Sequence, residues 1–331
     1  MTLIIAEIGS VHDGSFGNAK RLIDAIATTG ADVAKFQTHI APAETLRNAP
    51  MPSYFKGEPR FEYFERTGYT REKWAELKAH CESVGLEFIS SPFSIEAVEL
   101  LDSIGMVRWK IPSGEITNLP MLDALAQTGK PVILSSGMSS WAELDRAVET
   151  ILKHHDRLSI LQCTSEYPCP YEEVGMNVML EMRGRYNLPV GFSDHTLTIY
   201  APIVATTLGA SIIEKHFTFS RLMYGSDARH SLEPNEFKQM VDGIRAAELM
   251  IGSQVDKDAV AVKMREMKDI FEKSVVSVVD IPADTLITAE MLAVKKPGTG
   301  IPARRLNEVI GCRAVQDIPR DTVLQEAYIH A

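Results

Sequence analysis

The chain has 331 residues, of which 45% are hydrophobic and 24% are charged, so it can bury one large core and a small second one. Its formal net charge is -10 and its isoelectric point is near 5.5. This acidic balance argues against a nucleic-acid or anionic membrane surface, since both need clustered Lys and Arg.

Cysteine usage and the N-terminal segment indicate the compartment. The four cysteines have no C-x-x-C spacing, so they predict neither a zinc knuckle nor a disulfide framework. The N-terminal segment lacks the basic region of a signal peptide, and no segment approaches the length of a membrane span. We therefore expect a cytoplasmic protein.

Eight short β-branched segments recur along the first 218 residues, and amphipathic helical patterns lie between them. The predicted strands are 3–9, 33–38, 86–93, 108–114, 131–137, 158–165, 189–195 and 211–218. Eight alternating strand and helix units predict an α/β fold, a closed (β/α)8 TIM barrel. An open doubly wound sheet is compatible with the same alternation.

Polar residues at or just past the ends of these strands favour the barrel. They follow nearly every predicted strand: Glu7, Lys35, Gln37, Ser91, Lys110, Ser113, Glu115, Ser135, Ser136, Thr164, Ser165, Ser193, His195, Glu214 and His216. A barrel gathers all its strand ends around one mouth, whereas an open sheet spreads them along a line. The pattern predicts one shared site.

The sequence divides into three parts: a barrel over 1–255, a charged helical linker over 256–273 and a small domain over 274–331. The last part contains two similar phrases, DIPADTLITAE and DIPRDTVLQEA. So short a domain has little core of its own, and we expect it to pack on another surface.

The strand IIEKHFTF, residues 212–219, directs a carboxylate and an imidazole toward the barrel interior. Glu214 and His216 share one face, and Lys215 points to the opposite one. His195 ends the preceding strand. Two imidazoles at neighbouring strand ends suit a divalent cation with a partial protein shell, although each could be a hydrogen-bonded interior residue.

Lys35 and Lys110 end two further strands. An acidic protein that buries two ammonium groups needs an anion there to offset their desolvation. The alternative is that these lysines form structural ion pairs with Glu7 and Glu115. Serines at neighbouring strand ends could bond to phosphate or carboxylate oxygens: Ser91, Ser113 and Ser193.

Two other motifs carry no predicted chemistry. GTG at 298–300 is too short for a phosphate loop, and no G-x-G-x-x-G follows the first strand, so a dinucleotide cofactor is not supported. Cys163 lies in a strand among apolar neighbours, and we interpret it as structural.

Ordered motifs along almost the whole chain resemble those of the sialic acid synthases: AEIGSVHDG, AKFQTH, FISSPFS, KIPSGEITNLPML, ILSSGM, QCTSEYP, GFSDHT, IIEKHFT and KKPGTGIP. These nonulosonic acid synthases condense phosphoenolpyruvate with an N-acetylated hexosamine. The tail is similar to the antifreeze-like (SAF, β-clip) domain of that family.

The resemblance implies a domain-swapped homodimer in which each tail covers the partner's barrel mouth. It implies that His195 and His216 bind a divalent cation, Mn²⁺ first and Mg²⁺ as the alternative. It assigns phosphoenolpyruvate contacts to Lys35, Ser91, Lys110, Ser113, Ser165 and Ser193. It places five residues near the reacting carbons or the sugar: Glu7, Glu115, Tyr167, Glu214 and Asp227.

Two positions depart from the family pattern. Ser165 stands where some members have Asn, and Lys296 stands where many have an Arg that reaches across the dimer to the acyl group of the sugar. The planar guanidinium group of Arg gives two fixed hydrogen bonds and the ammonium group of Lys does not, so Lys296 bears on sugar specificity.

Glu7 is the first choice to orient or deprotonate water, with Glu115 and Glu214 as alternatives.

Several readings stay open at this point. N-acetylmannosamine is the first candidate acceptor, and a diacetamido-trideoxyhexose leading to legionaminic or pseudaminic acid is the alternative. A different enzyme on the same barrel would be an aldolase with a Schiff base on Lys110. A non-enzymatic sugar-binding or assembly protein would tolerate loss of Lys35 and His216.

Overall fold

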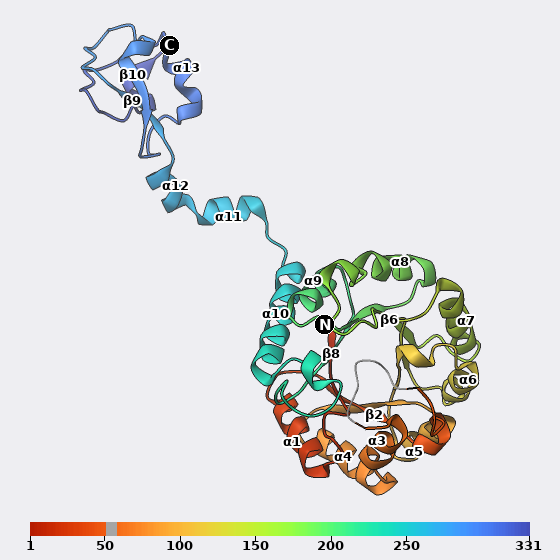
Figure 1. Ribbon diagram of the computed structural model, residues 1–331. Coiled ribbons are helices and arrows are strands. Elements are labelled where there is room, and N and C mark those ends of the chain that lie inside the picture. Colours follow the sequence, from red (N-terminus) through yellow and green to blue (C-terminus); the bar gives the residue numbers. More distant parts are fainter. Residues whose placement is uncertain (51–57) are drawn as a thin grey trace. The chain divides into compact units, whose positions relative to one another are not determined.

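The computed structural model describes residues 1–50 and 58–331, which divide into two compact units, Met1–Gly252 and Ser253–Ala331. In the first unit eight parallel strands form a ring that helices surround (Figure 1). The strand order is β3-β2-β1-β8-β7-β6-β5-β4, and the two end strands, β3 and β4, contact each other. The predicted (β/α)8 barrel is therefore confirmed, and the open doubly wound sheet is wrong.

The first unit follows the predicted strand sequence closely. Its strands are β1 Leu3–Gly9, β2 Val33–Thr38, β3 Glu87–Pro92, β4 Trp109–Ile111, β5 Val132–Ser135, β6 Leu158–Cys163, β7 Val190–Asp194 and β8 Ile212–His216. Its helices are α1 Phe16–Ala27, α2 Ala41–Glu44, α3 Arg60–Thr67, α4 Arg71–Ser83, α5 Ile95–Ser103, α6 Leu119–Gln127, α7 Trp141–Leu152, α8 Met176–Tyr186, α9 Tyr200–Thr207 and α10 Pro234–Gly252.

The interior of the barrel has an apolar layer below a polar one. Six strands contribute the apolar layer: Ile5, Val33, Ile89, Ile133, Leu161 and Ile212. Two positions further along the same strands come the buried residues of the polar layer: Glu7, Lys35, Ser91, Ser135, Cys163 and Glu214. Residues two apart on a strand share a face. The next inward-facing residue toward the carboxyl end of each of these strands is therefore outside the apolar layer and lies in the polar one.

The outer faces of the strands pack against apolar faces of the surrounding helices. Several of these helices begin at side-chain caps, such as Ser15 before α1, whose hydroxyl accepts from Asn18 N. Helix α7 begins with a capping box, in which Ser140 and Glu143 each bond to the other's backbone nitrogen. Burial of residues such as Leu22 and Leu144 on these helices completes the main core.

The second unit begins with two short helices, α11 Lys257–Lys263 and α12 Arg265–Phe271, so the helical character predicted for the linker is confirmed. Short elements follow: β9 Ser274–Ser277, β10 Leu292–Lys295, α13 Leu306–Val309, β11 Arg313–Ala314 and β12 Ile329–His330. A small separate core holds them together, including Val275, Ile287 and Leu324.

The two similar phrases of the second unit, 280–290 and 317–327, bond to each other reciprocally. Ile281 and Ile318 exchange backbone N–H···O hydrogen bonds of 2.8 Å in both directions. The Asp280 carboxylate accepts from Arg320 N at 2.7 Å, and the Asp317 carboxylate accepts from Ala283 N at 2.8 Å. The unit therefore has an internal pseudo-twofold axis.

Among the residues that the structure describes, no helix combines the length and the apolarity needed to cross a bilayer.

Candidate active site

A pocket of about 330 Å³ opens at the carboxyl ends of the barrel strands, a volume typical of small-molecule sites. Most residues predicted for the site line it: Glu7, Lys35, Lys110, Ser113, Ser165, Tyr167, Ser193, His195, Glu214, His216 and Asp227. The expectation that the strand ends share one cavity is confirmed for these residues.

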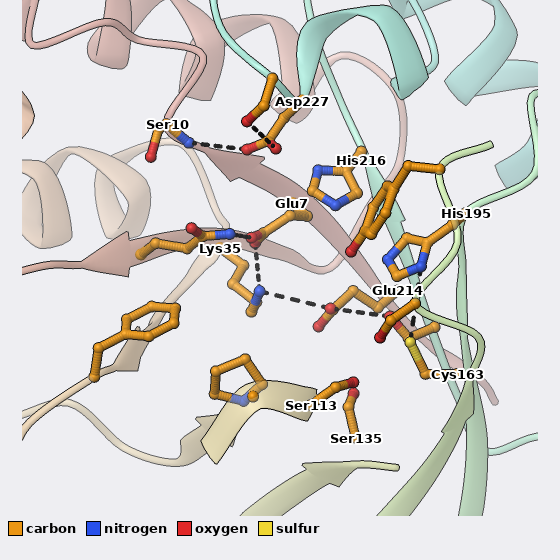
Figure 2. A pocket seen from close by; sticks show the side chains of 18 of the residues that line it. Glu7, Ser10, Lys35, Ser113, Ser135, Cys163, His195, Glu214, His216 and Asp227 are labelled. Atoms are coloured by element: carbon orange, nitrogen blue, oxygen red, sulfur yellow. Dashed lines mark hydrogen bonds and ion pairs between the residues drawn. The ribbon is translucent and has the colours of Figure 1, made fainter. Parts of the chain in front are cut away.

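Buried charges of both signs form the floor of the pocket. Lys35 Nζ lies 2.6 Å from Glu7 Oε2 and 3.5 Å from Glu214 Oε1 (Figure 2). Lys110 Nζ lies 3.4 Å from Glu214 Oε1 and donates to Ser135 Oγ at 2.7 Å. All four charged side chains are at least nine-tenths buried, so their interactions are weakly screened.

These contacts separate the pKa values of the two carboxyl groups. Burial, reinforced by Glu214, raises the pKa of Glu7 to about 7, although Lys35 and Gln37 oppose the rise. Burial also acts to raise the pKa of Glu214, but Lys110 and Lys35 outweigh it and bring it to about 2. Near neutral pH the site therefore holds one fixed carboxylate and one carboxyl group that can exchange a proton.

The lysines do form ion pairs, as the structural alternative predicted; Glu7 is a partner as expected, but Glu115 is not. Glu214 takes the place that the sequence suggested for Glu115, because Glu214 lies on the inner face of β8 beside both ammonium groups. Burial is the main cause that lowers the pKa of Lys110. For Lys35, burial lowers the pKa, yet Glu214 and Glu7 outweigh burial and raise it.

Serines form the wall beside the lysines. Ser193 Oγ donates to Glu214 Oε1 at 3.2 Å, while Ser113 and Ser165 line the pocket from the loops after β4 and β6. Gly137, in the loop after β5, lies between these two loops. A Cβ at this position would overlap both serine hydroxyls and would lie 2.7 Å from Ser113 Cβ. Only a glycine permits this close approach.

Two imidazoles and a phenol form the opposite wall. The ring centroids of His195 and His216 are 5.6 Å apart, and the Tyr167 ring lies 4.0 Å from that of His195. Asp227 lies beside this wall, and its Oδ2 accepts from Ser10 N at 3.5 Å. Figure 2 shows Glu7 on the lysine side of this wall, with its carboxyl group directed toward Lys35.

The two histidines fit a divalent cation with a partial protein shell. His195 Nδ1 lies 2.7 Å from the Thr164 carbonyl oxygen, which leaves Nε2 for a ligand, as the outer partner of a metal-bound imidazole does. His216 Nδ1 is buried and has no hydrogen-bond partner among the described residues. Burial, then the neighbouring His195 and Lys35, lower the pKa of His216 to about 3, so it is the neutral ligand form.

In the described part of the chain no three His, Cys, Asp or Glu side chains are arranged to hold a metal ion together. A cation between the two imidazoles would thus take its remaining ligands from substrate or water, as in an open catalytic site.

Cys163 lines the pocket, although the sequence indicated a packing role. Its Sγ lies 3.8 Å from His195 Nδ1 (Figure 2). Burial acts to raise the pKa of the thiol, but His195 outweighs it and lowers the pKa. The residue ends β6 on the polar inner layer. Of the apolar residues before it on the strand, Leu161 lies one layer deeper and Ile160 faces outward into the main core.

Lys215 points away from the pocket, as predicted from its place between Glu214 and His216. Its Nζ lies 2.5 Å from Asp194 Oδ2, and neither side chain is exposed to solvent. Asp194 also accepts from the backbone and hydroxyl of Thr196, at 2.9 and 3.0 Å. The ion pair links β7 to β8 next to the two histidines in sequence. The bonds from Thr196 to Asp194 hold the turn that carries His195.

Three predicted residues lie elsewhere. Glu115 follows β4 and bonds to Asn118 Nδ2 at 2.8 Å, outside the pocket lining, and burial raises its pKa. Ser91 belongs to the polar layer, but its buried hydroxyl has no partner among the described residues and it does not line the pocket. Lys296 belongs to the second unit, where its ammonium lies 4.8 Å from the Phe271 ring centroid.

The sequence did not indicate the aromatic and basic side of the pocket. Three of its residues come from α3, and His39 and Phe93 come from the loops after β2 and β3: His39, Arg60, Tyr63, Phe64 and Phe93. Helix α3 follows no predicted strand, so strand periodicity could not place it. The only signal was the density of aromatic residues in RFEYFERTGY.

Comparison with known proteins finds matches to two family models. Residues 22–256 match the NeuB family, and residues 272–329 match the SAF domain. The chain is 36% identical to the N,N'-diacetyllegionaminic acid synthase of Campylobacter jejuni, over 98% of this chain and 99% of that protein. It is 32% identical to the N-acetylneuraminate-9-phosphate synthase of Homo sapiens, over 98% of this chain and 92% of the other.

A solved structure has the same fold. The N-acetylneuraminic acid synthetase of Leptospira borgpetersenii, in complex with citrate, superposes with a TM-score of 0.70 at 30% identity. The match covers 81% of this chain and 91% of that one.

Proposed function

Because this chain belongs to the NeuB family of nonulosonic acid synthases and carries a SAF domain, we propose that it condenses phosphoenolpyruvate with an open-chain N-acetylhexosamine. The products would be a nonulosonic acid and inorganic phosphate, which makes the protein a transferase. One observation carries the proposal. A single pocket contains two lysines, two histidines and two carboxyl groups whose pKa values are shifted in opposite directions.

The lysine side of the pocket suits phosphoenolpyruvate. Lys35 and Lys110 would neutralise its phosphate and carboxylate charges, and the hydroxyls of Ser113, Ser165 and Ser193 would bond to its oxygens. Binding of this anion would offset the cost of two buried ammonium groups, which Glu7 and Glu214 offset in the free protein.

Glu7 is suited to the proton transfer that the reaction needs. Carbon 3 of phosphoenolpyruvate forms a bond to the aldehyde carbon, and the aldehyde oxygen takes up a proton to become a hydroxyl group. Water adds to carbon 2, the bond between carbon 2 and the phosphate oxygen breaks, and the remaining proton of the added water leaves with the phosphate. The attacking water must lose a proton, and a carboxyl group with a pKa of about 7 can accept it near neutral pH. Glu214 would stay ionised and stabilise the positive charge that develops at carbon 2.

The histidine side suits the acceptor. We propose that His195 and His216 hold a divalent cation, Mn²⁺ first and Mg²⁺ second, which when bound would polarise the aldehyde oxygen as a Lewis acid. Tyr167 and Asp227 lie beside the two histidines and would bond to the sugar.

The acceptor itself has two candidates. N-acetylmannosamine is the first, from the resemblance to sialic acid synthases. The 36% identity to a legionaminic acid synthase favours the second, a diacetamido-trideoxyhexose.

We further propose that the protein works in the cytoplasm as a domain-swapped homodimer, in which Lys296 of each tail reaches the partner's site. The apolar side chains exposed on α11 and α12, including Val262, Met267 and Phe271, support an assembly that covers them.

Phosphate release from phosphoenolpyruvate with a panel of hexosamines, each with and without chelator, tests the proposal. We expect phosphate with an N-acetylated acceptor only, and loss of turnover when chelator removes the metal. His195→Ala and His216→Ala should each abolish metal-dependent turnover. No release with any acceptor, or a borohydride-trapped adduct of pyruvate on Lys110, would contradict the proposal and favour the aldolase.

A further inference from the structure

A chain of hydrogen bonds runs from Glu7 away from the pocket floor to a buried histidine. Gln37 Nε2 donates to Glu7 Oε1 at 2.7 Å, and Gln37 Oε1 lies 3.2 Å from His39 Nε2. On the far side of the ring, His39 Nδ1 lies 2.8 Å from Glu44 Oε1. The side chains of His39 and Glu44 are each only 4% exposed.

The chemistry of each group fixes the direction of every bond. When Glu7 is ionised, as it must be to accept a proton, its carboxylate only accepts; Gln37 then turns its amide nitrogen to Glu7 and its oxygen to His39. That oxygen also only accepts, so His39 Nε2 carries a proton. Nδ1 of the same ring faces the Glu44 carboxyl group, and because a carboxylate only accepts, this nitrogen donates to it when it carries the second ring proton.

The surroundings of the ring suit a positive charge. The Phe64 and Phe93 rings lie on opposite sides of His39, with centroids 3.6 and 4.1 Å away and interplanar angles of 8° and 24°. Aromatic faces attract cations, and this attraction is stronger away from water. His12 is the other histidine close by; burial first, and His39 second, lower its pKa to about 4.

We propose that His39 is a positioning residue, which fixes the Gln37 amide so that its nitrogen faces the Glu7 carboxylate. This inference rests on the proposed function, since Glu7 is there the proton acceptor. Without the ring, the Gln37 amide could rotate and turn its oxygen toward Glu7, where two oxygens repel each other. His39 lies outside direct reach of Glu7, so it acts only through Gln37.

His39→Ala with chemical rescue tests the proposal. Removal of the ring should lower kcat by about 10- to 100-fold with little change in KM, as loss of a supporting partner does. Added imidazole, which enters the slot between the two phenyl rings and can carry two N–H groups, should restore most of the lost kcat. Pyrazole has the same shape but stays neutral near pH 7, and it should not restore it.

His80→Ala is the matched control. His80 Nε2 also bonds to a carboxylate, Asp24 Oδ1 at 2.7 Å, but on the outer helices α4 and α1. The kcat of the His80→Ala variant should equal that of the wild type, and added imidazole should not change it. Wild-type kcat in His39→Ala, or equal rescue by pyrazole, would overturn the proposal.

Two further measurements keep the test decisive. If His39→Ala does not fold, Glu44→Gln keeps the ring but weakens its anchor, and it should lower kcat in the same direction; an unchanged kcat would contradict the role of the chain of bonds. In wild-type protein with ¹⁵N-labelled histidine, His39 should show two slowly exchanging ring N–H signals, and only one would overturn the assignment. This spectrum needs no turnover, so it tests His39 even if the proposed function fails.

Discussion

Glu7 and Glu214 show how two identical side chains on one buried layer acquire opposite chemistry. Both are at least nine-tenths buried, so burial acts in the same direction on the pKa of each. Glu214 lies beside two ammonium groups and stays ionised, whereas Glu7 has one ammonium partner and the charge of Glu214 nearby. The position of Lys110 therefore decides which carboxyl group can carry a proton near neutral pH.

Glu7→Gln should change how the stability of the protein depends on pH. The raised pKa of Glu7 means that the folded protein holds this proton more tightly than the unfolded chain between its usual value of 4.5 and about 7. Stability from this group is thus complete below pH 4.5 and falls as pH rises through 7, by up to about 3 kcal/mol.

Urea unfolding of the metal-free wild type and of Glu7→Gln across this pH range measures the effect. The unfolding free energy of the variant should rise relative to that of the wild type as pH increases. A difference that does not vary with pH would count against the raised pKa of Glu7.

At the scale of the elements, the barrel strands place the charged residues and the loops bring their partners close. On six strands the polar layer lies two residues beyond the apolar layer. Strand periodicity alone therefore predicted that Glu7, Lys35 and Glu214 point into the barrel. The serines after β4 and β6 depend on how the connecting loops pack, and Gly137 is the point where these loops meet.

Gly137→Ala should displace Ser113 and Ser165, since the new methyl group would overlap both hydroxyls. We expect KM for phosphoenolpyruvate to rise by about 10-fold or more, because small misplacements of binding groups are costly. Steady-state kinetics with phosphoenolpyruvate as the varied substrate measures this.

Gly184→Ala, in α8, is the control for the same chemical change. A Cβ there meets no atom within 4 Å, so KM should not change, and helix propensity should stabilise the protein by about 1 kcal/mol. An unchanged KM in Gly137→Ala would show that the loop tolerates the methyl group.

The sequence predicted the strands and most of the site, but not the aromatic side of the pocket. Short β-branched segments between helical patterns identified all eight strands, and the polar residues at their ends pointed to the site. Phe64 and Arg60 lie on α3, a helix inserted between β2 and β3. A periodic pattern can predict such a helix, but it does not predict which part of the barrel the helix covers. Glu115 lies two residues beyond Ser113, but the short 3₁₀ turn Ser113–Glu115 directs it away from the cavity.

At the scale of the whole molecule, the chain comprises a large barrel unit and a small second unit with its own core. All the described residues that line the pocket belong to the first unit, while Lys296 belongs to the second. The proposed domain swap therefore requires that a complete site draws on two chains.

Co-expression of Glu7→Gln and Lys296→Ala chains tests that requirement. Each variant alone should have low activity, but a mixed dimer would combine an intact barrel of one chain with an intact tail of the other. About a quarter of wild-type activity is expected, since half of randomly formed dimers are mixed and each has one intact site. Activity no higher than the mean of the two parents would speak against the swap.

The reciprocal bonds between Asp280 and Arg320 and between Asp317 and Ala283 link equivalent positions in opposite directions. Two separate copies of one peptide would make the same bonds around a symmetry axis. The C-terminal unit thus holds two equivalent segments of one chain where a symmetric dimer would hold one segment from each of two chains.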